Sequence, residues 1–464
     1  MSNTLAKKFI GDRAFYKRVL AVSVPIMVQS GITNFVSLLD NIMVGRIGTE
    51  QMSGVAIVNQ LLFVFYLCIF GGFAGAGIFT AQYYGAEDNE GIRHTFRYKM
   101  WMGLALFGIA LVAFAGFGKE LIGLYLSSDA GGGDLEAALG YAMSYLHIII
   151  IGLPAFAAVQ AYSGTLRECG ETALPMKAGI AAVGVNLCFN YLLIYGKLGF
   201  PALGVRGAAI ATVLARFTEM AIVVIWSHAH PDRCPYMKGV YSTFLIPGRL
   251  IKKFFITGSP LLINEALWSA GMAMLTQCYS VRGLNVIAGQ NIASTVSNVF
   301  NVMFFALGDA IAIMVGQHLG AGDFEKAKDE DNKIIAFSMV IATAVGMMIF
   351  ASSFIFPMIY NTTPEAKLIA ARFLIVQAIF TPLICLLHVT YFTLRSGGRT
   401  VITFLFDSAF MWVVSVPLAY VLSRFTDIYV IWIFVSLMLA DLLKCIIGII
   451  LVKKGVWLNN IVKE

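Results

Sequence analysis

The sequence predicts an all-α membrane protein with twelve transmembrane helices, arranged as two parallel six-helix repeats, an N-lobe and a C-lobe, around a central cleft. Three observations support this fold class. Of its 464 residues, 59% are hydrophobic and only 13% are charged, whereas about a quarter of a soluble domain is charged. Twelve apolar stretches are each long enough to cross ~30 Å of hydrocarbon. The two halves of the chain also repeat each other.

The apolar stretches are continuous and do not alternate with polar residues, so they favour helices over a membrane barrel. The first stretch is too long for a signal peptide and lacks a small-residue cleavage site, so we expect it to be a membrane helix. The twelve stretches lie at 18–42, 53–80, 97–118, 139–162, 174–196, 205–228, 253–279, 287–317, 333–357, 367–392, 401–423 and 429–452.

The internal repeat rests on two segment pairs and two proline pairs at matching positions. Such duplication is typical of secondary transporters, whose binding sites lie within or between the repeats. The matched features are AQYYGAEDNE (81–90) with GQHLGAGDFE (316–325), TLRECGET (165–172) with TLRSGGRT (393–400), Pro25 with Pro260, and Pro154 with Pro382.

The repeat divides the chain into an N-terminal lobe (1–228), a linker (229–252) and a C-terminal lobe (253–464). Because six helices is an even number, both lobes begin on the same side of the membrane, and the repeats are parallel. With the N-terminus placed in the cytoplasm, the inner segments hold 23 Lys and Arg residues and the outer loops hold 8. This bias predicts a multi-pass protein of the plasma membrane, the inner membrane in bacteria, with both termini cytoplasmic.

The net charge of +7 is therefore interpreted as a topology signal, and no nucleic-acid partner is expected. The sequence has no P-loop, HExxH or G-x-S-x-G motif, which excludes the commoner nucleotide-hydrolysing, metalloprotease and hydrolase chemistries. The seven cysteines show no CxxC spacing. We expect no enzyme activity, no cofactor, no metal site and no disulfide.

Ionisable residues inside the apolar stretches need a reason, since a charge at bilayer depth costs ~2.5–3.5 kcal/mol on insertion scales. Arg216 and Glu219 are three residues apart, as are Asp441 and Lys444. This spacing places both partners on one helical face. We expect two ion pairs, inherited by both halves, with either a structural or a gating role.

Four acids lack a sequence-local cation: Asp40, Glu265, Asp309 and Asp407. An acid shielded from water can exchange a proton near neutral pH or hold a sodium ion among other oxygens. For Asp40, a solvated acid at a helix end is an equal alternative. Glu265 lies midway along its stretch, where function is favoured, and Asp309 and Asp407 suggest hydrogen bonding in an inner cavity.

Asn186 and Asn190 are four residues apart and share a helical face. Their amides can join helices or serve as neutral oxygen ligands, and the spacing leaves both open. Pro25 and Pro260 each remove a backbone hydrogen bond inside a predicted helix. They can bend that helix during transport or form fixed kinks.

At these residues the chain resembles the multidrug and toxic compound extrusion (MATE) family over nearly its whole length. The resemblance rests on the twelve spans, the six-plus-six repeat, Pro25 and Asp40 in the first span, the Q-x-x-GA-x-D loops, TLR-x-x-G-x-T after the fourth and tenth spans, and N-x-x-x-N-Y in the fifth. One branch of the family carries an acid in the tenth span, where this chain reads PLICLLHV.

The resemblance implies an antiporter that exports cationic or amphiphilic compounds in exchange for H+ or Na+ by alternating access. It implies that Asp40 is the ion-coupling carboxylate and that Asn186, Asn190 and Thr212 are its polar partners. Pro25 matches a proline whose helix bends on ion exchange. The expected partners are small cationic or amphiphilic molecules and membrane lipid, and a monomer is expected.

Two other functions were weighed against export. A lipid-linked oligosaccharide flippase of the same superfamily needs a basic cavity for a pyrophosphate, whereas Arg216 and Lys444 each lie next to an acid in the sequence. A membrane-embedded transferase needs catalytic groups clustered at one membrane face, and the repeat offers none.

Overall fold

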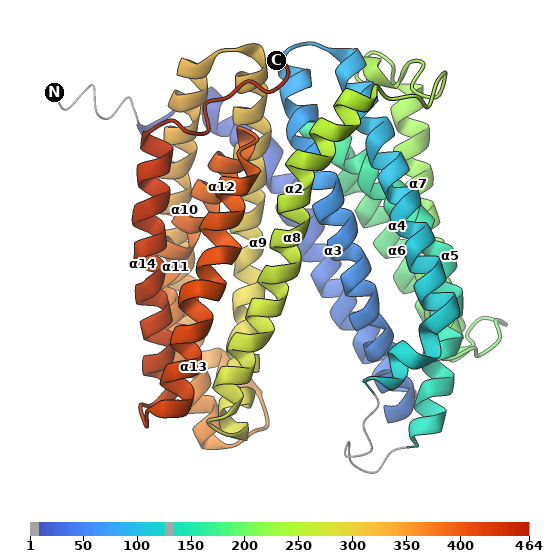
Figure 1. Ribbon diagram of the computed structural model, residues 1–464. Coiled ribbons are helices and arrows are strands. Elements are labelled where there is room, and N and C mark those ends of the chain that lie inside the picture. The colour runs from blue at the N-terminus through green and yellow to red at the C-terminus, as the bar shows by residue number, and fades with distance from the viewer. Residues whose placement is uncertain (1–8, 126–133, 464) are drawn as a thin grey trace. The chain divides into compact units, whose positions relative to one another are not determined.

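The computed structural model describes residues 9–125 and 134–463, and the regular structure of these residues is helical (Figure 1). The helices are α2 (Arg13–Gly45), α3 (Thr49–Gly85), α4 (Asn89–Gly123), α5 (Leu135–Glu168), α6 (Ala173–Tyr195), α7 (Val205–Ala229), η1 (Pro235–Met237), α8 (Gly248–Ser280), α9 (Leu284–Ala321), α10 (Phe324–Ile359), α11 (Pro364–Ser396), α12 (Thr400–Phe404), η2 (Leu405–Ala409), η3 (Met411–Ser415), α13 (Val416–Phe425) and α14 (Val430–Lys453).

Each predicted stretch lies within one long helix and passes its end by at most one residue, and α12 to α13 together form the eleventh. Most of the helices are longer than the predicted stretches, by up to nine residues at one end. Eleven of the described helices are long and apolar enough to cross a membrane, by length and composition. The twelfth long helix is α8, whose mean hydropathy is lowered by Asn264 and Glu265 near its middle. The predicted all-α membrane class is confirmed.

Side-chain caps and glycines set several helix ends. Asp134 accepts hydrogen bonds from the backbone N–H groups of two residues in the first turn of α5, both at 3.0 Å. In the second GA-x-D segment, Asp323 accepts from the backbone N–H of Lys326 at 3.1 Å and so caps α10. Gly322, which ends α9, has a left-handed φ of 81°, a conformation that glycine adopts at little cost.

The described chain forms two compact units. Unit 1 contains residues up to Met27, Ala81–Asp88 and Phe255 onward, and unit 2 contains Val28–Thr80 and Asn89–Phe254. Helices α2, α3 and α8 therefore begin in one unit and end in the other. The predicted lobe boundaries at 228 and 253 stay a prediction.

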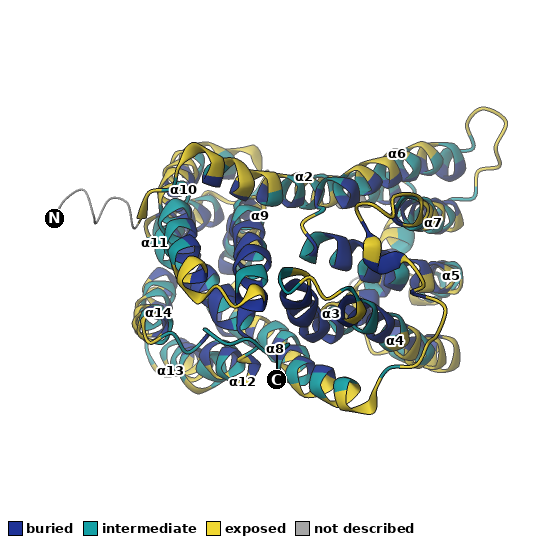
Figure 2. Cartoon of the chain, turned by 90° about the horizontal axis from the view of Figure 1, so that it is seen from above, coloured by how far each residue is buried: buried dark blue, intermediate teal, exposed yellow. Residues whose placement is uncertain are grey.

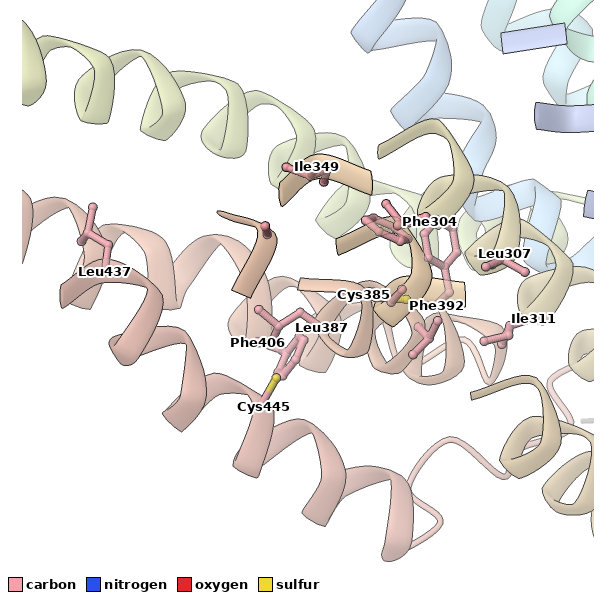
Figure 3. Close-up of a cluster of buried hydrophobic side chains, with 14 of the residues drawn as sticks. Phe304, Leu307, Ile311, Ile349, Cys385, Leu387, Phe392, Phe406, Leu437 and Cys445 are labelled. Atoms are coloured by element: carbon pink, nitrogen blue, oxygen red, sulfur yellow. The ribbon is translucent and has the colours of Figure 1, made fainter. Parts of the chain in front are cut away.

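In unit 1, helices α9, α10 and α11 pack against one another, and α14 packs against α11 (Figures 1 and 2). Figure 3 shows part of the apolar core that holds them together, where Phe304, Cys385 and Phe392 meet between helices. Because lipid tails are as apolar as these side chains, close van der Waals packing, and not removal from water, holds the helices together within the membrane. In unit 2, α5 packs against α4 and α7, and α7 packs against α6.

The two GA-x-D segments of the repeat, residues 85–88 and 320–323, contact each other inside unit 1. A Cβ atom on Gly85 would lie 1.8 Å from the backbone oxygen of Gln317, and one on Gly320 would lie 1.8 Å from that of Gln82. Glycine is required at both places because each helix end presses on the other's backbone. The sequence indicated loop architecture here, and the structure adds this reciprocal contact.

The C-terminal segment after α14 is bound at the same place. Gln82 is fully buried; its amide nitrogen donates to the backbone oxygens of Ser396 and Asn459, both at 3.1 Å, and its oxygen accepts from the backbone N–H of Ile461 at 2.9 Å. The Asn460 amide donates to the backbone oxygen of Gly320 at 3.0 Å. The end of α3, the end of α9 and the C-terminal segment thus share one hydrogen-bonded corner of unit 1.

Candidate functional site

A polar cluster in unit 2 surrounds Asp40, which lies six residues inside the described end of α2. Asn190 of α6 donates from its amide nitrogen to the Asp40 carboxylate at 2.6 Å and to the Asn186 oxygen at 3.0 Å. Asn186 donates in turn to the Thr212 hydroxyl of α7 at 3.4 Å. Within the described residues Asp40 forms no ion pair, so its contacts here are neutral. The structure therefore brings together the four residues that the resemblance indicated.

Two amides lie next to the carboxylate. The Asn186 oxygen is placed 2.9 and 3.2 Å from the two Asp40 oxygens, and turning this amide over relieves that arrangement because its nitrogen then donates to the carboxylate. The side-chain oxygen of Asn190 is buried and has no hydrogen-bond partner among the described residues. Asn190 is only 1% exposed. A buried amide oxygen without a partner, next to a carboxylate, can be engaged by a proton on the acid or by a bound cation.

Helix spacing explains why these residues meet. Asn186 and Asn190 are one turn apart on α6 and present their amides on one face, as the spacing predicted. Thr212 lies on α7, which packs directly against α6, and its hydroxyl also donates to the backbone oxygen of Ala208 at 3.0 Å. The site thus joins the end of α2 to the α6–α7 pair.

Tyr145 of α5 was missed by the sequence reasoning. It is 6% exposed, hydrogen-bonds Thr212, and lies within electrostatic range of Asp40 and Arg216. A buried tyrosine in an aromatic-rich membrane helix carries no sequence signal that separates it from core tyrosines. Arg216 itself pairs with Glu219 at 3.1 Å, which confirms the first predicted ion pair and commits this cation to another acid.

A second polar cluster lies in unit 1 and corrects one expectation. Lys444 donates to Asp407 at 2.6 Å, so the expected Asp441–Lys444 pair is wrong; Asp407 has no sequence-local cation but is paired with one 37 residues away. Asn264 also donates to Asp407, at 3.2 Å, while its oxygen accepts from the Ser408 hydroxyl at 2.7 Å. The physical reason is packing between helices: α14, which carries Lys444, contacts the turn η2, which carries Asp407.

The remaining secondary candidates are not members of that ion pair. Glu265 follows Asn264 in α8 and lies within electrostatic range of Asp407 and Arg395. Asp309 lies in α9 and is half-buried. The roles of both acids stay predictions.

Both predicted helix-bending prolines lie inside helices, close to the residue where the helix changes unit. Pro25 in α2 comes two residues before the helix passes from unit 1 to unit 2 at Met27. Pro260 in α8 comes five residues after that helix enters unit 1 at Phe255. A proline weakens the backbone hydrogen bonding of the adjacent turn, so each proline softens its helix near the junction.

Proteins named as multidrug resistance proteins are similar to this chain over almost its full length. The "Probable multidrug resistance protein NorM" of Thermotoga maritima is 25% identical over 448 residues, which cover 95% of this chain and 93% of that protein. The "Multidrug resistance protein MdtK" of Edwardsiella ictaluri is 24% identical and covers 88% of this chain and 87% of that protein.

A solved structure described as the outward-facing conformation of a multidrug resistance MATE family transporter of the MOP superfamily shares the fold. The TM-score is 0.80 at 20% identity, with 94% of each chain covered. The MatE family model matches residues 25–192 and 260–421, so both matches begin at a member of the Pro25–Pro260 pair. The chain therefore belongs to the MatE family, whose members are membrane transporters and not enzymes.

Proposed function

We propose that this protein is a cation-coupled antiporter that exports small cationic or amphiphilic compounds by alternating access. The curated relatives named above are called multidrug resistance proteins, and the family membership carries that activity to this chain as a proposal. One observation carries the coupling: Asp40 is held by neutral amides, and a buried amide oxygen beside it has no partner.

The coupling step follows from the chemistry of this cluster. When H+ or Na+ binds, it neutralises Asp40 and engages the unpartnered amide oxygen of Asn190. When the ion leaves, the carboxylate is exposed as a negative charge that attracts a cationic substrate. Because ion and substrate both compensate the same charge, each favours release of the other. Exchange of one such ion for a monovalent cationic substrate moves no net charge, so the concentration gradient of the ion drives it. For an uncharged substrate, one elementary charge moving across 100 mV yields ~2.3 kcal/mol, which supports roughly a 50-fold substrate gradient.

The test is efflux by the Asp40→Asn variant reconstituted in liposomes with an imposed pH or sodium gradient and a cationic dye. Asparagine keeps the size and the hydrogen bonding to Asn190, so we expect a folded protein whose dye movement no longer depends on either gradient. Gradient-driven efflux at the wild-type rate would overturn the assignment. The wild-type protein tested with each gradient separately identifies the coupling ion.

The flippase alternative receives no support from the described charges. Three cations in the membrane helices, Lys99, Arg216 and Lys444, pair with Glu168, Glu219 and Asp407 respectively. The buried Arg97 donates to the backbone oxygens of Val240 and Gly239. Each pair is already neutral, so these cations do not supply the excess positive charge that a pyrophosphate requires. Dye export and lipid-linked sugar transport, assayed in the same proteoliposomes, separate the two functions.

A further inference from the structure

The segment between α7 and α8 is held along the surface of α4 in unit 2. Arg93 donates to the backbone oxygen of Tyr236 at 3.3 Å, Arg97 to that of Val240 at 2.9 Å, and Trp101 to that of Phe244 at 3.1 Å. The donors are one helical turn apart, and the acceptors follow at the same spacing of four residues. The segment therefore runs parallel to α4 for two turns, roughly 12 Å.

This attachment gives the segment two different faces. Tyr236, Met237 and Val240 are buried, at 3% exposure or less. Phe244 and Leu245, at its far end, are 52% and 81% exposed. An apolar end held by a partly exposed tryptophan, next to a membrane span, is the arrangement found at the boundary between headgroups and acyl chains.

The charge of this region has one sign. Five basic residues and no acid lie between Asp232 and Glu265. The neighbouring acids are engaged elsewhere: Glu171 pairs with Arg233, and Glu90 pairs with Arg93. Three exposed basic residues, namely Lys238, Arg249 and Lys252, take part in no ion pair within the described part of the chain.

We propose that these residues form a binding surface for anionic phospholipid headgroups, here called the linker surface, made of Lys238, Tyr241, Phe244, Leu245, Arg249 and Lys252. Lysine and arginine attract the phosphate of the lipid, while Phe244 and Leu245 enter the acyl boundary. Basic clusters next to a membrane span attract anionic lipid in this way. The surface fixes the start of α8, the helix that carries Pro260 and Asn264, against the membrane.

The test measures lipid retained by the purified full-length protein, using native mass spectrometry with phosphatidylglycerol and phosphatidylcholine. Each removed charge weakens phosphatidylglycerol binding about 5-fold. The variant Lys238→Gln/Arg249→Gln/Lys252→Gln is therefore expected to bind it on the order of 100-fold more weakly, with phosphatidylcholine binding unchanged. The matched control Lys17→Gln/Lys326→Gln/Lys328→Gln removes three exposed lysines elsewhere and is expected to bind like the wild type.

Two further variants separate the contribution of charge from that of side-chain identity, and the contribution of the headgroup from that of the acyl chains. The charge-preserving variant Lys238→Arg/Arg249→Lys/Lys252→Arg should bind phosphatidylglycerol as the wild type does. The variant Phe244→Ser/Leu245→Ser should lose phosphatidylglycerol but keep binding of glycerol 1-phosphate, which has no acyl chain. Equal binding of both lipids by the wild type, or equal loss in the linker and control variants, would overturn the proposal, and neither outcome bears on Asp40.

Discussion

The two units each enclose a membrane-embedded aspartate, but they neutralise it differently. In unit 2, Asp40 accepts from the Asn190 amide at 2.6 Å and has no ion pair within the described residues. In unit 1, Asp407 accepts from the Lys444 ammonium at 2.6 Å and from Asn264 at 3.2 Å. The first acid is held by amides, and the nearest cation in electrostatic range, Arg216, pairs with Glu219. The second acid is in direct contact with a lysine of the chain.

This difference assigns different roles to two clusters of similar composition. The charge of a carboxylate is already neutralised when it pairs with a buried lysine. An incoming ion must then displace the lysine ammonium, which cannot leave the site because it is part of the chain. A carboxylate held by amides keeps its negative charge, and a proton or a sodium ion that binds there stabilises it strongly. The comparison teaches that an acid in a membrane helix indicates an exchange site only when its cation is not supplied by the protein itself.

The largest expected effect separates the two acids by stability. Asp407→Asn leaves Lys444 buried without its partner, which costs roughly 3–5 kcal/mol of the free energy of unfolding. Asp40→Asn removes no ion pair and should cost less than about 1 kcal/mol. Thermal unfolding of the two purified variants in the same detergent gives the ranking directly.

A double variant checks the cause of that loss. Asp407→Asn/Lys444→Met removes both charges and should recover most of the stability lost in Asp407→Asn, because neither member of the pair is left without the other. If the double variant is as unstable as the single one, the ion pair is not what Asp407 contributes.

The second expected effect concerns ion affinity. Asn190→Ala removes a hydrogen bond to a carboxylate and an oxygen beside it; such bonds are worth ~1.5–3 kcal/mol. If Na+ is the coupling ion, we expect the ion concentration for half-maximal efflux to rise roughly 10- to 100-fold, because a ligand oxygen is lost. If H+ is the coupling ion, that concentration should instead fall by a similar factor, because the lost N–H donor stabilised the charged carboxylate. Asn264→Ala, the matched change in unit 1, should leave that concentration unaltered. Equal shifts in the two variants would remove the distinction between the clusters.

The sequence was sufficient for the features that depend on local pattern. Twelve continuous apolar stretches predicted twelve helices because a bilayer admits few other structures. The i, i+4 spacing of Asn186 and Asn190 predicted a shared face, and i, i+3 spacing predicted the Arg216–Glu219 pair. The resemblance added Asp40 and Thr212, which no local pattern connects to α6.

The predictions were wrong or incomplete where the contacts of a residue depend on which helices pack against each other. Asp441 and Lys444 have the same spacing as Arg216 and Glu219, yet Lys444 reaches Asp407, 37 residues away in the chain. Asp407 lies in the turn η2, which α14 contacts in the fold, and the sequence does not indicate that contact. Tyr145 and the reciprocal contact between Gly85 and Gln317 were missed for the same reason: both depend on packing between distant segments.

The third expected effect compares the two threonines of the TLR repeat. Thr393 donates to the buried Asp331 at 2.6 Å, while Thr165 accepts from Lys99 at 3.2 Å and Lys99 also pairs with Glu168. Thr393→Val should therefore cost ~1–3 kcal/mol because it deprives a buried acid of a partner. Thr165→Val should cost ~0.5–1.5 kcal/mol, since Lys99 keeps its acid. Chemical or thermal unfolding of both variants tests the order.

The smallest expected effect is on the rate of the transport cycle. Pro25→Ala restores a backbone hydrogen bond in α2 next to the junction between the units, which stiffens the helix that carries Asp40. We expect efflux to slow by a few-fold while ion affinity stays within about 2-fold, because the Asp40 cluster itself is unchanged. Pro260→Ala changes α8 in the same way, but that helix carries Asn264 of the lysine-neutralised cluster, so its effect on ion-dependent efflux should be smaller. Equal slowing by the two variants would mean that both prolines serve the movement of the units and that bending of α2 has no special link to ion exchange at Asp40.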